Sequence, residues 1–229
     1  MKKNDPKTIN AWCSYDWANS VYNLTITASI FPAYYAGTTR AAFGGDIVNF
    51  GGLSIDSSVL YTYAISFSFL VVVLLSPTLS GIADYSGKKK RFMRFFTYTG
   101  ALACIGLFWF TGENIEWGIA CSVTASVGYA GALVFYNAFL PEIVTPDRVD
   151  RVSARGFSMG YIGSVILLVV NLALITFHEA VGLEETFAVR LAFLMVGFWW
   201  FGFAHIAFVR LKDRPTGHKL TGAVVSKGF

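Results

Sequence analysis

The chain alternates between six long apolar stretches and short polar connections. Each stretch is about as long as the roughly 20 residues that a helix needs to cross a bilayer, and none contains Asp, Glu, Lys or Arg. The pattern therefore predicts an all-α, polytopic membrane protein with six transmembrane helices. The predicted spans are Trp17 to Thr39, Ser57 to Ala83, Phe95 to Gly112, Gly118 to Leu140, Gly156 to Phe177 and Leu191 to Val209.

Basic residues gather on alternate connections. The segment before the first span, the second and fourth connections and the C-terminal tail hold all of the 18 Lys and Arg residues except Arg40 and Arg190. Basic residues of short loops stay on the cytoplasmic side, so we expect both termini to be cytoplasmic. We divide the chain into a cytoplasmic N-terminus (1–10), a transmembrane bundle (11–209) and a tail or start of a linker (210–229). The connection from Gly37 to Ser57, rich in Gly, Asn, Asp and Ser, is expected to be irregular.

The amino-acid composition excludes several classes of protein and of functional site. Hydrophobic residues make up 55% of the chain and charged residues only 14%, which excludes an ordinary soluble domain. The net charge of +4 is not accompanied by a basic and aromatic face in a soluble context, so no nucleic-acid partner is expected. Cys13, Cys104 and Cys121 fall in apolar surroundings and are expected to be small buried side chains. No catalytic set, metal site or cofactor is predicted, and the protein is not expected to be an enzyme.

Polar residues mark one side of the first predicted helix, which we expect to begin near Ala11, so that Asp16 is the one charged residue within a span. Wound as a helix, they lie within about 100° of one another, around an acid whose burial in a bilayer is costly. Such a stripe must face water or other helices, so we interpret it as part of a solute path. An interhelical hydrogen-bond seam is the alternative. The stripe consists of Asp16, Asn19, Ser20, Asn23 and Thr27.

Two later spans add polar or small residues. Ser126 and Asn137 share one side of the fourth span with Ser122 and Tyr129 and predict a second polar wall of the path. In the fifth span, small residues that include Gly156 and Gly160 favour close helix packing, with Asn171 as a hydrogen-bonding link between helices.

Charged and aromatic side chains near the span ends give further expectations. We hypothesise that Arg155, which enters the fifth span from the same side as Asp16 enters the first, pairs with that acid. His205 is expected to be a structural hydrogen-bonding residue rather than a proton carrier. Trp199 and Trp200 are expected to face lipid.

The segment Ser80–Lys89 resembles the loop signature of the major facilitator superfamily, which lies between the second and third helices. The resemblance depends on Asp84, Gly87 and Lys89, while Lys88 stands where the pattern has arginine. Three further segments look like the vacuole-effluxer-like branch of that superfamily, related to autophagy-associated amino-acid exporters of fungal vacuoles. They are Ala11–Ser20, Leu140–Ile143 and Val152–Gly163.

The resemblance implies a fold of twelve helices in two bundles with the solute site between them, of which this sequence matches the N-terminal half. We expect a fragment, with the missing C-terminal half or a partner chain as the second six-helix bundle. Asp84 is then a gating residue that engages the partner bundle. Gly163 is followed by Ser164 and not by proline, which argues against a drug antiporter.

The expected function is that of a secondary transporter for a small solute, with an amino acid favoured, that works by alternating access. The bilayer and the solute are the other expected partners, and the bacterial inner membrane is favoured over the vacuolar membrane. The alternative is a truncated, non-transporting scaffold that binds lipid or protein.

Overall fold

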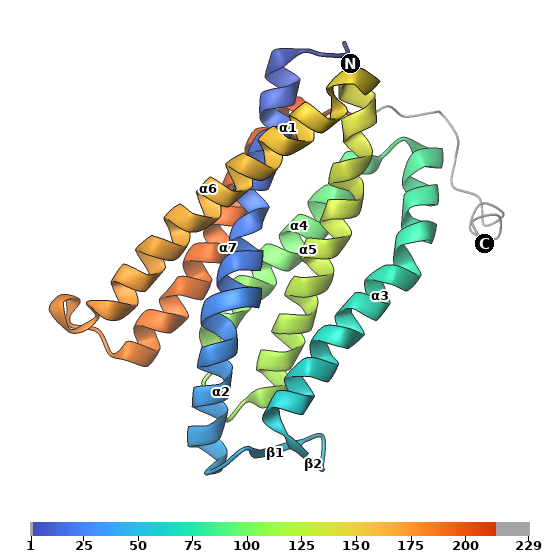
Figure 1. Cartoon of the computed structure of the whole chain (residues 1–229). Coiled ribbons are helices and arrows are strands. Elements are labelled where there is room, and N and C mark those ends of the chain that lie inside the picture. Colours follow the sequence, from blue (N-terminus) through green and yellow to red (C-terminus); the bar gives the residue numbers. More distant parts are fainter. Residues whose placement is uncertain (1, 214–229) are drawn as a thin grey trace.

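The computed structural model describes residues 2–213, apart from the side chains of Ile82, Asp84 and Ser86. Within this range the chain forms a bundle of long helices with one short hairpin (Figure 1). The long helices are α1 (Pro6–Val21), α2 (Ile30–Phe43), α3 (Ser57–Ser86), α4 (Lys89–Gly106), α5 (Ile115–Ile143), α6 (Val149–Thr176) and α7 (Glu185–Arg210). The shorter elements are η1 (Tyr22–Ser29), η2 (Leu107–Trp109), η3 (Pro146–Arg148), η4 (Glu179–Val181), β1 (Ile47–Phe50) and β2 (Leu53–Asp56).

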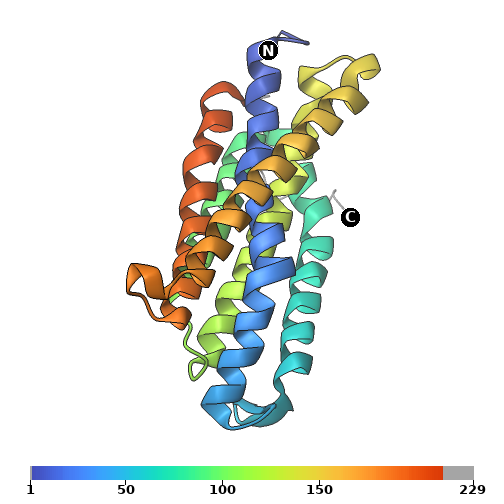
Figure 2. The same ribbon diagram turned by 60° about the vertical axis from the view of Figure 1, so that its left-hand side comes forward.

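The structure confirms an all-α membrane architecture. Five helical segments are long and apolar enough to cross a bilayer, and they correspond to the second to sixth predicted spans. The first span is formed by α1, η1 and α2, which follow one another without a break (Figures 1 and 2). This helix begins at Pro6, because Asp5 caps it by accepting hydrogen bonds from the backbone N–H and hydroxyl of Thr8 at 2.9 and 2.6 Å.

The middle of the first span is a π-helix. In η1 the turn is wider than in an α-helix, and the N–H of Ile30 bonds to the carbonyl oxygen of Thr25. The backbone then bends at Ser29, where φ is −126° and ψ is −79°. A π-helical turn changes the angular spacing of the side chains. A prediction that assumes 100° per residue therefore gives wrong directions for the side chains after Val21.

The outer connection is more regular than the sequence predicts. Helix α2 continues to Phe43, where Gly44 ends it in the left-handed conformation with φ of 70°. Strands β1 and β2 then pair antiparallel, with Ile47 opposite Asp56. The prediction of an irregular segment from Gly37 to Ser57 is therefore wrong. Its glycines instead supply the positive φ angles that a helix end and a tight hairpin require.

Helices α3 and α6 lie on either side of the bundle. Helix α3 packs mainly on α5, and α6 packs mainly on α1. Helices α4 and α7 lie behind the layer formed by α6, the first span, α5 and α3 (Figures 1 and 2). The side chain of Trp200 on α7 is completely buried, and the Trp199 indole donates to the carbonyl oxygen of Trp17 at 3.0 Å. The expectation that both tryptophans face lipid is wrong, because Trp200 packs inside the bundle against Tyr22 and Tyr129, and the half-buried Trp199 stacks on Trp17.

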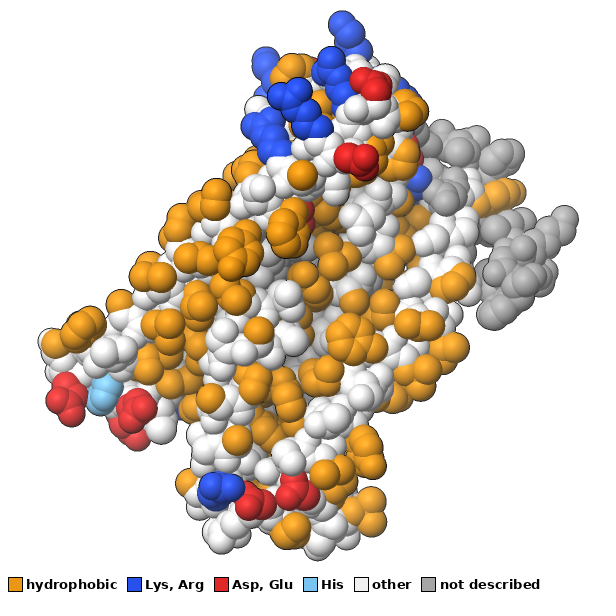
Figure 3. Space-filling model, in the orientation of Figure 1, with side chains coloured by type: hydrophobic (Ala, Val, Ile, Leu, Met, Phe, Trp, Pro, Cys, Tyr) orange, Lys and Arg blue, Asp and Glu red, His pale blue; other side chains and the backbone are white. Residues whose placement is uncertain are grey.

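The two ends of the bundle differ in charge. Lys and Arg side chains gather at the end that carries the N-terminus, and acidic side chains predominate at the opposite end (Figure 3). The side of the membrane on which each end lies stays a prediction from the sequence.

Candidate functional site

Asp16 meets Tyr136 where α1 crosses α5. The Tyr136 hydroxyl donates to Oδ2 of Asp16 at 2.9 Å. Trp12, one turn before Asp16, stacks on the Tyr136 ring with centroids 4.2 Å apart and planes 10° apart. The Trp12 indole also donates to the Tyr136 carbonyl oxygen at 3.0 Å. The tyrosine is thus fixed by its ring and its backbone, and its hydroxyl is aimed at the carboxylate.

Glycines of α6 form the third side of this site. A Cβ atom on Gly156 would lie 2.9 Å from Oδ2 of Asp16 and 3.0 Å from the Tyr136 hydroxyl. At Gly160 it would lie 2.5 Å from the Ser20 hydroxyl and 3.0 Å from the Asp16 carbonyl oxygen. Only glycine lets α6 approach so closely, and the structure places Gly156 and Gly160 at this contact.

The structure divides the polar stripe of the first span. Asp16 and Ser20 are half-buried beside α6, whereas Asn19 turns inward and is 1% exposed. Its amide nitrogen has no hydrogen-bond partner among the described residues. Asn23 and Thr27 lie in the π-helix, where Asn23 is exposed and Thr27 is half-buried. The five residues therefore do not form one continuous row.

The predicted second wall is also divided. The Ser68 hydroxyl donates to the Ser126 hydroxyl at 2.7 Å, so that Ser126 joins α5 to α3. Asn137 lies one residue after Tyr136 and is exposed, on a different side of α5. Ser126 therefore lies in the contact between α5 and α3, and the Asn137 side chain is exposed.

The expected ion pair between Asp16 and Arg155 is absent from the described part of the structure. Arg155 is exposed, and its neighbour Gly156 is the residue that faces Asp16. One residue along a helix corresponds to a rotation of 100°, which turns the guanidinium away.

The expected hydrogen-bonding link through Asn171 is wrong as well, because its amide is fully buried and lacks a hydrogen-bond partner among the described residues.

The segment Ser80–Lys89 ends in an ion pair. Gly87 has a φ of 63°, a conformation that glycine adopts without strain, and it separates α3 from α4. The ammonium group of Lys89 lies 2.6 Å from Oε1 of Glu142 at the end of α5. Lys88 is exposed, and the side chain of Asp84 lies outside the described residues. Two segments that carry the family resemblance are thus joined in space.

Sequence reasoning missed Tyr136 as the partner of Asp16. Nothing in a single sequence reports a contact between distant spans. The His205 ring forms hydrogen bonds of the kind expected, to the carbonyl oxygen of Phe201 at 2.7 Å and to the Tyr98 hydroxyl at 3.0 Å.

The described residues hold no group of three His, Cys, Asp or Glu side chains that could bind a metal. The three cysteines are free, and all three are buried, as the sequence predicts of their surroundings. The site therefore contains a hydrogen-bonded carboxylate within the first span.

The fold and this site define a class, the polytopic α-helical membrane proteins with an acid inside a span. The model of a family described as "Vacuole effluxer Atg22 like" matches residues 4–229. The chain therefore belongs to the vacuole effluxer Atg22-like family, a branch of the major facilitator superfamily.

Named relatives support this assignment. The chain is 34% identical over 203 residues to a protein of Bacillus subtilis (strain 168) named uncharacterized MFS-type transporter YxiO, a match that covers 87% of this chain and 45% of that protein. It is 26% identical to autophagy-related protein 22 of Yarrowia lipolytica, over 74% of this chain and 38% of the relative. It is 23% identical to autophagy-related protein 22-1 of Penicillium rubens, over 75% of this chain and 39% of that relative.

The chain thus spans less than half the length of these curated relatives. No solved structure matches it.

Proposed function

We propose that the chain is the N-terminal six-helix half of a secondary transporter that moves a small solute, with an amino acid favoured, by alternating access. The observation that carries the proposal is the carboxylate of Asp16, half-buried within the first span and bound by Tyr136. An acid at such a position is costly in a bilayer and typically belongs to a solute or proton pathway. The family of transporters to which the chain belongs supports the same reading.

The exposed polar residues favour a second bundle as the partner. Asn23 on η1 and Asn137 on α5 are exposed within spans, and an amide that faces hydrocarbon lacks hydrogen-bond partners. In Figure 1, α6, the first span, α5 and α3 lie across one face of the molecule, in front of α4 and α7. A second six-helix bundle on this face would enclose both amides along a hydrated path.

In this mechanism the chain's residues supply the binding groups on one side of the path. The Asp16 carboxylate takes up a proton or a positively charged group of the solute, and the Tyr136 hydroxyl holds it in position. The Trp12 ring fixes Tyr136 from behind. Rocking of the two bundles would open this site to each side in turn. We place both termini in the cytoplasm and the protein in a bacterial membrane.

The test is the change Asp16→Asn in the complete two-bundle transporter, reconstituted in liposomes. Asparagine has nearly the same size but cannot take up a proton. We expect solute flux to fall by about tenfold and to lose its dependence on pH. Glu113→Gln serves as the matched control, because Glu113 is an exposed acid in the connection before α5.

Two results would decide against the proposal. A pH dependence that is the same in the Asp16→Asn variant and the parent would exclude Asp16 as the proton carrier. If the two-bundle protein moved no solute at all, while the bundle still bound lipid or a protein partner, the scaffold alternative would replace the transporter.

A further inference from the structure

A groove opens on the outside of the bundle beside the connection of α3 to α4, lined by residues of both helices and of the turn between them. It has a cavity volume of about 440 Å³ and combines two cationic side chains with a mostly aromatic floor. Its lining residues are Leu79, Lys88, Arg91, Phe92, Phe95 and Phe96. The groove lies away from the site of Asp16.

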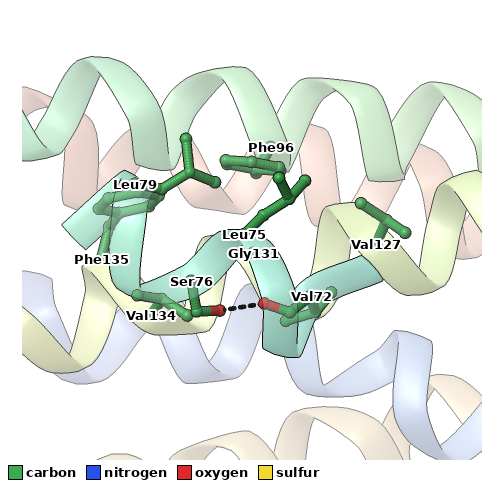
Figure 4. A pocket seen from close by; sticks show the side chains of 9 residues that line it. All are labelled: Val72, Leu75, Ser76, Leu79, Phe96, Val127, Gly131, Val134 and Phe135. Carbon is green, nitrogen blue, oxygen red and sulfur yellow. Dashed lines mark hydrogen bonds between the residues drawn. The ribbon is translucent and has the colours of Figure 1, made fainter. Parts of the chain in front are cut away.

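The floor of the groove continues into the apolar part of the bundle. Leu79 and Phe96 also line a narrow slot between α3, α4 and α5 (Figure 4). A Cβ atom on Gly131 would lie 2.5 Å from the Phe96 ring, so this glycine lets Phe96 lie close against α5. The hydroxyl of Ser76, a polar group in the slot, donates to the carbonyl oxygen of Val72 at 2.6 Å (Figure 4). The slot therefore presents a hydrocarbon surface.

The two cations of the groove differ from their neighbours. Lys89 pairs with Glu142, and the Lys90 ammonium donates to the carbonyl oxygen of Phe208 at 3.3 Å. Lys88 and Arg91 are exposed, and neither has an acidic partner among the described side chains. They are available to an anion.

Position along the spans identifies the kind of anion. Lys88 and Arg91 flank the start of a span, at the depth where phospholipid headgroups lie. Phe95, one turn further into the membrane, is 62% exposed. Cations at headgroup depth above exposed apolar rings match a ligand with a negative head and a hydrocarbon tail.

We propose that this groove binds one glycerophospholipid of the bilayer that carries an anionic headgroup. Its phosphate lies between Lys88 and Arg91, and one acyl chain lies over Phe95, Phe96 and Leu79 at the mouth of the slot. The lipid fills the space between the last turns of α3 and the first turns of α4. Pro77 interrupts the backbone hydrogen bonds of α3 close to this point, so the lipid also braces the end of that helix. The inference does not depend on the proposed transport function.

Native mass spectrometry of the full chain in a neutral detergent tests the site. The probes are phosphatidylglycerol and phosphatidylcholine with identical acyl chains. We expect phosphatidylglycerol to bind about tenfold more tightly, and the double change Lys88→Gln with Arg91→Gln to remove this preference. Lys3→Gln with Lys7→Gln is the control, because it removes the same charge from exposed residues that do not line the groove. The control should stay within about twofold of the parent.

A second change tests the tail contact. Phe95→Ser should weaken the binding of both lipids about threefold, since it removes an exposed ring beneath the headgroup. Circular dichroism confirms that each variant keeps its helices.

Three results would overturn the proposal. The first is equal binding of the two lipids by the parent, and the second is an equal loss of phosphatidylglycerol binding in the control. The third is displacement of the lipid by millimolar glycerol 1-phosphate, which would assign the groove to a free anion.

Discussion

The Tyr136 hydroxyl donates to the Asp16 carboxylate at 2.9 Å, although the two residues are 120 positions apart in the chain. This bond joins the first span to the fourth at the point where glycines of α6 close over both side chains. A carboxylate in this position has its orientation set by α5 and its space limited by α6. A movement of either helix would therefore change the surroundings of the acid.

The change Tyr136→Phe separates the hydrogen bond from the packing. Phenylalanine keeps the ring that stacks on Trp12 but removes the donor to Asp16. Because a hydrogen bond to a charged group contributes about 1.5–3 kcal/mol, we expect solute flux through the complete transporter to fall by tenfold or more. Tyr161→Phe is the control, since Tyr161 is exposed on α6. Equal flux in parent and Tyr136→Phe would show that the bond has no part in transport.

Gly128 tests the contact between α4 and α5. A Cβ atom there would lie 2.5 Å from the Gly100 Cα and 2.6 Å from the Gly100 nitrogen. Gly128→Ala must therefore push two backbones apart, and we expect a loss of about 1–3 kcal/mol in the free energy of unfolding. Gly202 has open space at the same position of its side chain, so Gly202→Ala should be neutral or slightly stabilising. Thermal unfolding in detergent compares the two, and equal midpoints would contradict the close contact.

The spans could be predicted because the cost of burying charge in a bilayer acts on each segment separately. A window without Asp, Glu, Lys or Arg carries its own evidence, which is why the six stretches agree with the helices of the structure. The close approach of α6 through Gly156 and Gly160 was predictable for the same reason, since the spacing of small residues is a local property.

Contacts between spans could not be predicted in the same way. Arg155 and Asp16 enter their helices from the same side, but a rotation of one residue decides whether they meet, and Gly156 takes that place. The prediction of one polar stripe assumes α-helical geometry beyond Val21, whereas η1 is π-helical. Tyr136 gave no signal as the partner of Asp16, because its role depends on which helices are neighbours.

The ion pair of Lys89 with Glu142 leads to a prediction about stability. Both side chains are mostly shielded, with exposed fractions of 15% and 25%, and the atoms lie 2.6 Å apart. Glu142→Gln keeps the shape but removes the negative charge that lies against this ammonium group, so we expect unfolding to become easier by about 1–3 kcal/mol. Glu116→Gln, at an exposed position in the first turn of the same helix, should change stability little. If both variants unfold alike in a denaturant series, the pair contributes nothing to the join between α4 and α5.

Asp56 should make the start of α3 sensitive to pH. Its Oδ1 accepts hydrogen bonds from the hydroxyl and N–H of Ser58 at 2.6 and 2.9 Å and from the N–H of Val59 at 3.3 Å. The bonds from Ser58 and then that from Val59 lower the pKa of Asp56 below its usual value of 3.8. A lowered pKa stabilises the folded state above the unfolded pKa, and this contribution disappears as the pH falls through the folded value. Amide exchange in the first turn of α3, corrected for the intrinsic pH dependence, should therefore accelerate below about pH 4. Asp56→Asn keeps a capping oxygen that does not titrate, so its corrected exchange should stay constant over the same range. An equal acceleration in the variant would assign the effect to another group.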